Sequence, residues 1–519
     1  MQTNGEQTSF LMPFGADFDE SNRWVRLARL VPWLVAESEY GKRFDHDRGG
    51  HRPLSARVAL GALIVKERLG LSDRETVEQI RENPYIQFFL GYGSFSSAVP
   101  FDPSLMTHFR QRLGLECVQA VNAQVIAAML ERKSAANQDQ DQDQDQDGDG
   151  DGDGTPLRGP TTSDLSDQPD AAPAPQGSLL IDATCTPADI TYPTDLKVLN
   201  HAREITEQVI DALHAPLAGS EVKPRTYRRR ARRHFLSAAR SKKLTQSDRR
   251  VAAGKQLRFV RRNLSTIAKR IASGRWTLTL LGRVLYQKLL VASEVYRQQT
   301  HLYRSRDRSI ADRIVNVAQP HIRPIVRGKA GAPTEFGAKI SVSLIGGCAS
   351  LDRLSWDAYH EGADLSVQAE AFRARTGHYP AVVYADKAYT SRANRAWCSQ
   401  RGIRLAGIGP GRPPADPDAE RARRRMARDD DAARQPIEGV FGRAKRRWSL
   451  QRIMAKLATT AACVIAVVFL VMNLEALLTP ILLVLLVSLA LCYLVGALGR
   501  RIPTERRPLG QAGWTAIGG

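Results

Sequence analysis

Two acidic residues each stand at the end of a short apolar segment, and their carboxylates could bind metal ions. Asp182 lies at the end of the run at 178–183, and Asp386 follows the run at 381–385. Short apolar runs of this kind predict buried β-strands, so we expect the two carboxylates at one edge of a sheet. The alternative is an ordinary role for each Asp as a helix cap or a turn residue.

A third carboxylate, carried by a helix packed on that sheet, would complete a pocket for two hard cations. Mg²⁺ takes oxygen ligands and leaves room for substrate phosphates. Two such ions about 4 Å apart can activate a nucleophilic oxygen and stabilise a leaving one. A trio of acids therefore suggests chemistry on phosphodiesters.

Glu438 is the candidate for this third carboxylate, because basic residues surround it on a predicted helix. Lys445 is seven residues further on and therefore shares a helix face with Glu438. Pro436 predicts the first turn, which would place Arg434 at or before the N-cap. The other nearby cations, which could hold a phosphodiester over a metal, are Arg443, Arg446 and Arg447. The alternative is a solvated basic helix with ion pairs inside the helix.

The elements that must position these acids change their hydrophobic period after Pro320. The predicted strands are 337–345, 350–356 and 403–406. The predicted helices are 364–376 and 391–400, followed by a Gly- and Pro-rich loop at 407–414. Strands first, and then alternating strands and helices, predict a mixed sheet flanked by helices.

The N-terminal part predicts a helical domain. Apolar residues at helical spacing mark a helix at 55–69, and Ser72 with Glu75 forms a capping box that begins a second, which ends at Asn83. A third helix follows Asp102 or Ser104, with His108, Arg110 and Arg112 on its polar side. Short helices with a basic last member suggest a helix-turn-helix-like DNA reader, and the alternative is a helical bundle that only packs.

Charge is distributed unevenly along the chain. The 519 residues carry a net charge of +20, which favours a polyanionic partner, either nucleic acid or an anionic membrane surface. Residues 223–275 hold 19 Lys and Arg against one acid, within a predicted helical segment at 195–319. We interpret this basic block as a clamp on DNA that binds in a salt-dependent, sequence-independent way. Its proposed contacts are Arg228, Arg229, Arg230, Arg232 and Arg233. The alternative is a highly charged, solvated helix pair.

Two further segments have unusual composition. Residues 134–178 are rich in Gln-Asp and Gly-Asp repeats, which cannot bury a core and predict a solvated acidic linker. Residues 481–498 form an uncharged apolar run that would span about 27 Å as a helix, near the minimum for crossing a membrane. This run could be a buried or dimerising helix, a fusion or a membrane anchor. The scattered cysteines, without a CxxC pair, predict reduced thiols.

Motifs occur in a consistent order over most of the chain. They are Asp102-Pro-Ser-Leu with Phe109-Arg, Asp182-Ala-Thr-Cys-Thr-Pro-Ala-Asp-Ile, Pro320-His-Ile-Arg-Pro-Ile-Val-Arg-Gly-Lys, Glu335-Phe-Gly-Ala-Lys, Tyr384-Ala-Asp386-Lys-Ala-Tyr389 and Pro436-Ile-Glu438-Gly-Val-Phe-Gly. In this order they resemble bacterial insertion-sequence transposases of the DDE class, in the superfamily of insertion-sequence families four and five. Arg434, Glu438 and Lys445 match the last three positions of the family's Tyr, Arg, Glu, Lys signature, and Asp431 stands at its Tyr position.

The resemblance implies a ribonuclease H-like α/β catalytic domain with a helical insertion, and an all-α N-terminal DNA-binding domain. It implies that Asp182, Asp386 and Glu438 are the catalytic residues and hold two Mg²⁺ (or Mn²⁺) ions. Water would hydrolyse a phosphodiester bond at a terminal inverted repeat, and the freed 3′-hydroxyl would attack target DNA. The implied partner is double-stranded DNA, both transposon ends and target, bound by a homodimer or higher oligomer. The alternative function is that of a catalytically inactive transposon-end-binding protein or regulator.

The predicted organisation has a DNA-binding domain at 1–133, the acidic linker at 134–178 and the catalytic domain at 179–478. The basic insertion at 195–319 lies inside the catalytic domain, since only 52 residues separate Asp386 from Glu438. A hydrophobic extension follows at 479–519. We expect a cytoplasmic, nucleoid-associated protein, with membrane contact through 481–498 as the less favoured alternative.

Overall fold

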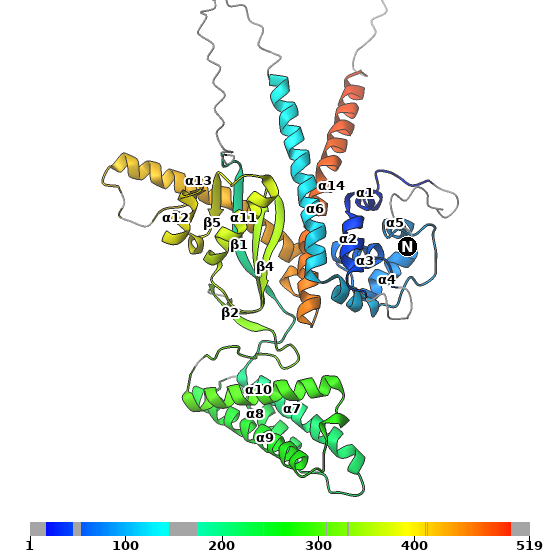
Figure 1. Cartoon of the computed structure of the whole chain (residues 1–519), viewed down its shortest axis with the longest axis vertical. Helices are drawn as coiled ribbons and strands as arrows, with labels where there is room; N and C mark the ends of the chain where they lie inside the picture. The colour runs from blue at the N-terminus through cyan, green and yellow to red at the C-terminus, as the bar shows by residue number, and fades with distance from the viewer. Residues whose placement is uncertain are drawn as a thin grey trace, which may run out of the picture.

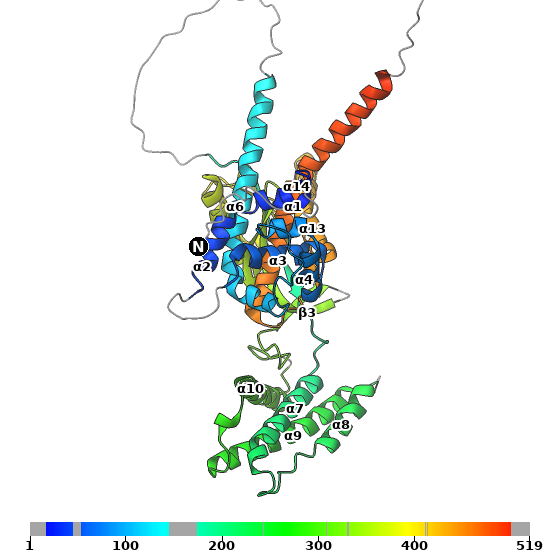
Figure 2. The same ribbon diagram turned by 90° about the vertical axis from the view of Figure 1, so that its right-hand side faces the viewer.

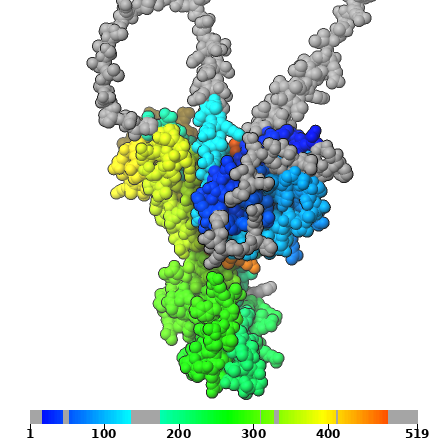
Figure 3. All heavy atoms as spheres, turned by 45° about the vertical axis from the view of Figure 1, so that its right-hand side comes forward, coloured from blue at the N-terminus to red at the C-terminus, as the bar shows by residue number. Residues whose placement is uncertain are grey.

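The computed structural model of the chain describes residues 17–44, 53–144, 174–241, 243–307, 309–329, 332–409, 412 and 414–499. Figure 1 shows a group of N-terminal helices beside a central sheet with its own helices, and a second helical group below them. Figure 3 shows that the N-terminal helices pack against the body of the sheet, while the second group forms a lobe of its own.

The N-terminal part is helical, as predicted. Its helices are α1 (Arg23–Leu30), α2 (Trp33–Gly41), α3 (Ala56–Leu69), α4 (Asp73–Glu82), α5 (Pro84–Phe89) and α6 (Leu105–Gln144). The side chains of Ser55 and Ser72 accept the N–H groups of Val58 and Glu75 and so cap α3 and α4. Asn83 caps α5, whose first residue is a proline that needs no N–H partner. Local side-chain chemistry therefore sets these helix boundaries.

Helix α6 is longer than predicted. It continues to Gln144, past the predicted domain boundary at 133, because the Ala and Gln residues that follow that boundary are good helix formers. Most of the predicted acidic linker, 145–173, lies outside the described residues. The start of the linker is therefore helical, and its described side chains, Ser134 and Ala135, are exposed, as expected for a solvated segment.

A mixed six-stranded sheet forms the centre of the molecule, as predicted. Its strands are β1 (Ser178–Pro187), β2 (Arg323–Lys329), β3 (Ala332–Ile345), β4 (Cys348–Ser355), β5 (Val382–Ala385) and β6 (Arg404–Leu405). The order is β2-β3-β1-β5-β6, with β4 also paired to β3. Strand β1 runs antiparallel to β3 on one side and parallel to β5 on the other. This mixed sheet with flanking helices is compatible with a ribonuclease H-like fold.

Strand β1 differs from its prediction in a way that matters for Asp182. The strand does not end at Asp182 but continues to Pro187, because β3 pairs with it over that whole length. Strand β5 pairs only as far as Ala385, which lies opposite Ile181. Asp182 is therefore the first residue of β1 beyond the end of β5, at the same sheet edge as Asp386.

Helices cover both faces of the sheet. The α-helices that follow β4 in the chain are α11 (Leu365–Thr376), α12 (Arg392–Ser399), α13 (Pro417–Arg447) and α14 (Ala458–Gly499). Helix α11 shares a small core with Ile181 and Leu179 of β1, whereas α6, α13 and α14 share a larger one with Leu180 and the N-terminal helices. The buried cysteines of the described chain are free thiols, as predicted.

Side-chain amides from α6 and α14 cover the free edge of β4. Asn473 of α14 accepts the N–H of Ala349 at 2.9 Å and donates to its C=O at 2.8 Å. It also donates to the side chain of Asn122 on α6 at 2.8 Å, and Gln119 donates to the C=O of Leu351 at 2.9 Å. These amides take the place of a neighbouring strand and join the N-terminal helices to the sheet.

Replacing Asn473 by Leu should destabilise the whole protein by about 3 kcal/mol, because the buried N–H of Ala349 would lose its partner and its C=O would keep only a 3.4 Å bond from Asn122. Leucine has a similar volume, so the loss reports the hydrogen bonds rather than a cavity. Urea denaturation of the full chain measures it. The exposed Thr107→Ala variant on α6 is the control, and equal stability of the two variants would contradict the role given to Asn473.

Among the residues that the structure describes, two helical stretches are long and apolar enough to cross a membrane by length and composition, Leu105–Ala135 and Ala458–Leu478. The second is 83% buried inside the protein, which is typical of a core helix. The predicted apolar run at 481–498 continues α14 without a break, but its side chains lie outside those described. Its membrane contact therefore stays a prediction.

The second helical group is the insertion between β1 and β2. It consists of α7 (Asp195–His214), α8 (Arg228–Arg240), α9 (Gln246–Ala272) and α10 (Arg283–Ser305), which lie side by side in Figures 1 and 2. Its core, which includes Val209 of α7, Ile267 of α9 and Val295 of α10, is separate from the cores of the sheet. The insertion therefore has the contacts of a small helical domain.

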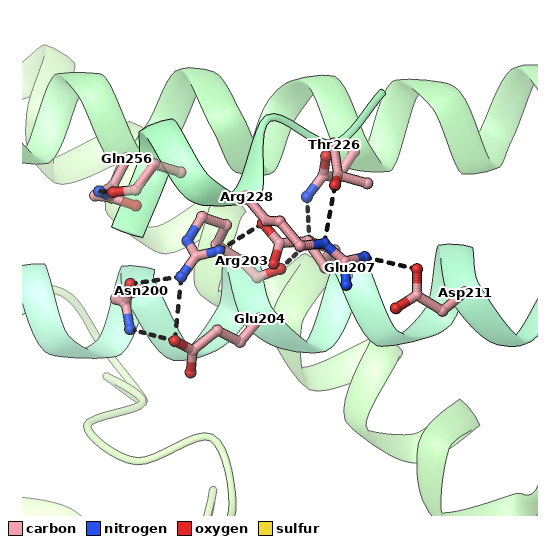
Figure 4. Close-up of polar contacts among 11 residues, drawn as sticks. Asn200, Arg203, Glu204, Glu207, Asp211, Thr226, Arg228 and Gln256 are labelled. Carbon is pink, nitrogen blue, oxygen red and sulfur yellow. Dashed lines mark hydrogen bonds and ion pairs between the residues drawn. The ribbon is translucent and has the colours of Figure 1, made fainter. Parts of the chain in front are cut away.

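A buried arginine organises the start of this insertion. Arg203 of α7 is 1% exposed, and its guanidinium pairs with Glu207 at 2.5 Å and donates to Asn200 at 2.8 Å. One turn beyond Glu207 on α7, the carboxylate of Asp211 accepts a hydrogen bond from the guanidinium of Arg228 in α8 at 2.6 Å (Figure 4). The pair between Arg228 and Asp211 sets the position of the N-terminus of α8 on α7.

Candidate functional site

The three predicted acids come from three different elements around one edge of the sheet. Asp182 lies in β1, Asp386 directly follows β5, and Glu438 lies in α13, which packs against both strands. The side chain of Asp182 is 15% exposed, whereas Asp386 and Glu438 are exposed. Asp386 also caps a short helical turn, since its carboxylate accepts the N–H of Lys387 at 2.6 Å.

Helix α13 is longer than predicted, and this moves Arg434 into the site. The helix begins at Pro417 and passes through Pro436, which was expected in its first turn. The upstream segment is rich in Ala and Arg, both strong helix formers, and Asp416 caps it. The position predicted for Arg434, at or before an N-cap, is therefore wrong. Arg434 lies one turn before Glu438 on the same helix face.

The guanidinium of Arg434 lies between two of the acids. It pairs with Glu438 at 2.5 Å and with Asp182 at 3.5 Å. One arginine thus connects the α13 carboxylate to the β1 carboxylate. The Arg434–Glu438 pair lies within one helix, as in the alternative of a solvated basic helix with internal ion pairs. The contact between Arg434 and Asp182 shows, however, that this helix face is turned toward the sheet rather than only to solvent.

The electrostatics of Asp182 differ from those of an ordinary surface acid. Burial raises the pKa of Asp182 to about 6, and the charges of Asp386 and Glu361 act in the same direction. The N–H of Ala183 and the charge of Arg434 lower it, but they do not compensate fully. Three carboxylates are therefore close enough to affect one another, and a cation near Asp182 would stabilise its charged form.

The donor set suits a hard cation, although it is not gathered around one point. Among the described residues, no three Asp, Glu, His or Cys side chains lie close enough together to hold one ion. The carboxylate oxygens are the ligands that Mg²⁺ prefers. The hydroxyl of Tyr389 is buried and makes no hydrogen bond within the described chain, and the charges of Glu361 and Asp182 both act on it. A buried carboxyl of raised pKa, together with an unpartnered buried hydroxyl, fits a bound cation.

The basic residues at the end of α13 have distinct surroundings. Lys445 donates to the hydroxyl of Thr184 in β1 at 3.0 Å, two residues from Asp182. Arg443 and Arg446 are exposed. Arg447 is 60% exposed and pairs with Glu475 of α14 at 3.3 Å. The structure therefore brings Arg434 and Lys445 to β1 on the same side of the sheet as Asp182.

The two predicted DNA contacts in the N-terminal part, His108 and Arg110, differ in their exposure to solvent. His108 is exposed at the start of α6. Arg110 is 7% exposed and forms an ion pair with Asp73 of α4, so its predicted place on the polar side of the helix is wrong. The apolar neighbours of α6 pack on α3 and turn this position inward, which leaves the guanidinium to join two helices.

The basic block of the insertion is divided between paired and exposed cations. Arg228 is paired with Asp211, and Lys223 pairs with the same carboxylate at 2.6 Å. The other four predicted contacts on α8, which are Arg229, Arg230, Arg232 and Arg233, are exposed and form no ion pair within the described chain. Arg228 is thus an anchor for α8, and the other four are its solvent-facing charges.

Glu361 and Tyr389 are the groups that the sequence did not single out. Tyr389 is the last residue of the motif Tyr384-Ala-Asp386-Lys-Ala-Tyr389. Its position in that motif did not indicate that its hydroxyl would be buried near Asp182. Glu361 precedes α11 and pairs with Lys339 of β3 at 2.6 Å. Only the fold brings it to the edge that holds Asp182 and Asp386, so neither the residue type nor its neighbours in the chain indicated a role.

Comparisons with known proteins agree with this arrangement. Residues 383–475 match the family described as "Transposase DDE domain", and residues 13–112 match the family described as "Transposase domain (DUF772)". A curated relative, "Uncharacterized protein ORF8 in nfe locus" of Rhizobium meliloti, is 32% identical over 139 residues, which span 26% of this chain and 63% of that protein. No solved structure matches the chain. The first match contains Asp386 and Glu438, and together the two matches confirm the resemblance stated above.

Proposed function

Because the chain carries transposase domains, one of them of the DDE type, we propose that it is a transposase that cuts and joins DNA. It binds the terminal inverted repeats of a transposon, cleaves phosphodiester bonds there and transfers the 3′-hydroxyl end to target DNA. Its catalytic domain has a ribonuclease H-like fold. The predicted oligomer on DNA and the predicted cytoplasmic, nucleoid-associated location stay predictions.

One observation carries this proposal. Asp182 and Glu438, which are 256 positions apart, approach the same guanidinium, and Asp386 acts electrostatically on Asp182 from the end of β5. An arrangement of acids from two central strands and a covering helix is what phosphodiester chemistry with divalent cations requires. The DDE family match over 383–475 supports the same assignment.

The residues have separate roles in this proposal. Asp182, Asp386 and Glu438 would hold two Mg²⁺ or Mn²⁺ ions, which activate the attacking oxygen and stabilise the leaving one when bound. Arg434 neutralises Asp182 and Glu438 and is free to turn toward a phosphate when those acids take other partners. Lys445, steadied by Thr184, presents its ammonium beside β1 and orients the phosphodiester. Arg443 and Arg446 extend the positive surface along the DNA backbone.

Cleavage and joining of DNA that carries the flanking inverted repeats tests the proposal. The full chain should act only with Mg²⁺ or Mn²⁺, and Asp386→Ala should remove the activity while DNA binding persists. Equal products from the wild type and this variant would exclude the catalytic assignment. Tight binding of the repeats without cleavage by the wild type would instead support an inactive end-binding protein.

A further inference from the structure

A fourth carboxylate stands beside the three that the proposed function uses. Glu361 opens the short turn Glu361–Asp364, which leads directly into α11, and α11 packs against β1 through Leu365. The side chain of Glu361 is 22% exposed. A partly buried acid at the start of this helix lies on the face of the sheet opposite α13, so the edge holding Asp182 has carboxylates above and below it.

The contacts of Glu361 resemble those of the other acids in one respect. Its carboxylate pairs with the ammonium of Lys339 at 2.6 Å, and Lys339 also donates to the C=O of Tyr359 at 2.8 Å. Arg434 has the corresponding place between Asp182 and Glu438. The protein thus supplies one basic side chain on each face of the sheet to neutralise acids at this edge.

The backbone holds the turn of Glu361 against the loop of Asp386. A Cβ atom on Gly362 would come 2.5 Å from the C=O of Ala388, so only glycine permits this close approach. The side-chain amide of Asn394 donates to the C=O of Gly362 at 2.7 Å and to that of Tyr389 at 2.8 Å. These bonds fix the two loops to each other and therefore fix the positions of their acids.

The hydroxyl of Tyr389 points to a ligand at this place. The side chain is 0% exposed, and its oxygen has no hydrogen-bond partner within the described chain. Burial raises the pKa of Tyr389, and the charge of Glu361 acts on it more strongly than that of Asp182. Buried hydroxyls are normally hydrogen-bonded, so one without a protein partner calls for an explanation such as a bound ion or water. The charges that act on Tyr389 include those of three carboxylates, Glu361, Asp182 and Asp364, and carboxylates favour a cation as the bound group.

We propose that Glu361 is a fourth carboxylate of the cation site and binds a divalent cation together with Asp182. The inference rests on the proposed function and adds a residue to its site. Lys339 neutralises Glu361 in the absence of the cation and competes with it for the carboxylate. Asn394 is a positioning residue that sets the turn of Glu361 against the loop of Asp386.

Mn²⁺ binding to the full chain without DNA tests this assignment. Titration followed by the electron paramagnetic resonance of free Mn²⁺ should show an affinity about tenfold or more weaker for Glu361→Gln than for the wild type. Glu370→Gln is the matched control, because this acid lies on the same α11 and pairs with Arg401, away from the edge. Lys339→Met should bind Mn²⁺ at least as tightly as the wild type, since it removes the competing cation.

The outcomes separate this inference from the proposed function. If the wild type binds Mn²⁺ and cleaves DNA while Glu361→Gln binds Mn²⁺ equally well, the carboxylate of Glu361 forms only the ion pair with Lys339 and the inference is wrong. If the wild type neither binds Mn²⁺ nor cleaves, the proposed function itself fails. Thermal unfolding in chelator checks that each variant folds. Should Glu361→Gln not fold, Glu361→Asp keeps the charge for Lys339 but shortens the side chain, and unweakened Mn²⁺ binding by that variant would equally overturn the inference.

Discussion

Replacing Asp182 by Asn will give a protein that no longer cleaves DNA and yet is more stable than the wild type near neutral pH. Loss of one cation ligand removes several kcal/mol of transition-state stabilisation, which corresponds to about a thousandfold or more in rate. The gain in stability has a separate cause. Asp182 is 15% exposed and charged at neutral pH, and Asn avoids the cost of burying that charge.

The pKa of Asp182 gives the size and the sign of the stability change. Burial raises this pKa from 3.8 to about 6 in the folded protein, so the folded state binds the proton more tightly than the unfolded state. The resulting stabilisation is complete below about pH 4 and is lost as the pH rises through about 6. The variant should therefore match the wild type near pH 4 and exceed it by up to about 3 kcal/mol at pH 7.5.

Denaturation of both proteins in chelator at these two pH values measures the change, and a cleavage assay measures the loss of activity. Asp189→Asn is the control, because Asp189 lies just beyond β1 and pairs with Arg452 at 2.6 Å. Cleavage retained by Asp182→Asn would remove Asp182 from the site. A variant less stable than the wild type at pH 7.5 would show that Arg434 compensates the buried charge after all.

Neutralising four exposed arginines of α8, Arg229, Arg230, Arg232 and Arg233, should weaken DNA binding and make it less dependent on salt. Each arginine that contacts a phosphate releases counterions and contributes about 0.9 to the slope of log affinity against log salt, so replacing all four by Gln should lower that slope by up to about 3.6. Arg228 is left in place, because its pair with Asp211 fixes α8 on α7. The weakening should be similar for specific and unrelated DNA sequences, since phosphate contacts do not read bases.

Measurement of DNA affinity between 50 and 200 mM salt, by fluorescence anisotropy, tests this expectation. Arg297→Gln is the control within the insertion, since this exposed arginine on α10 is already neutralised by Glu294 at 2.7 Å. A slope unchanged in the fourfold variant would mean that the basic block is a solvated helix pair. A change confined to one DNA sequence would indicate base contacts instead.

The sequence alone predicted the structure correctly where contacts between residues close together in the chain determine it. Ser55, Ser72 and Asn83 mark helix boundaries because their side chains satisfy N–H groups only a few residues away. The apolar run before Asp386 is short enough to be a buried strand and nothing else, and β5 has nearly the predicted bounds. Gly346 and Gly347 stand between the predicted strands 337–345 and 350–356, and both have positive φ in the turn that joins β3 to β4.

The errors arose where distant parts of the chain decide the outcome. Strand β1 extends beyond Asp182 because β3, about 150 residues further along the chain, pairs with it as far as Pro187. Helical packing rather than polarity decides that Arg110 is buried, since its partner Asp73 lies on another helix. Glu361 had no sequence signal at all, because its relevance comes from a turn that two hydrogen bonds of Asn394 hold against another loop.

The separate cores of this molecule constrain how it can evolve. The N-terminal helices share buried residues with α14 and the sheet, and Asn473 completes the edge of β4, so exchanging those helices for another domain would open the core of the catalytic part. The insertion has its own apolar centre and its own buried arginine. Recombination between related genes can therefore replace the insertion as a cassette and change the affinity for DNA. The acids and the sheet that supports them are inherited together.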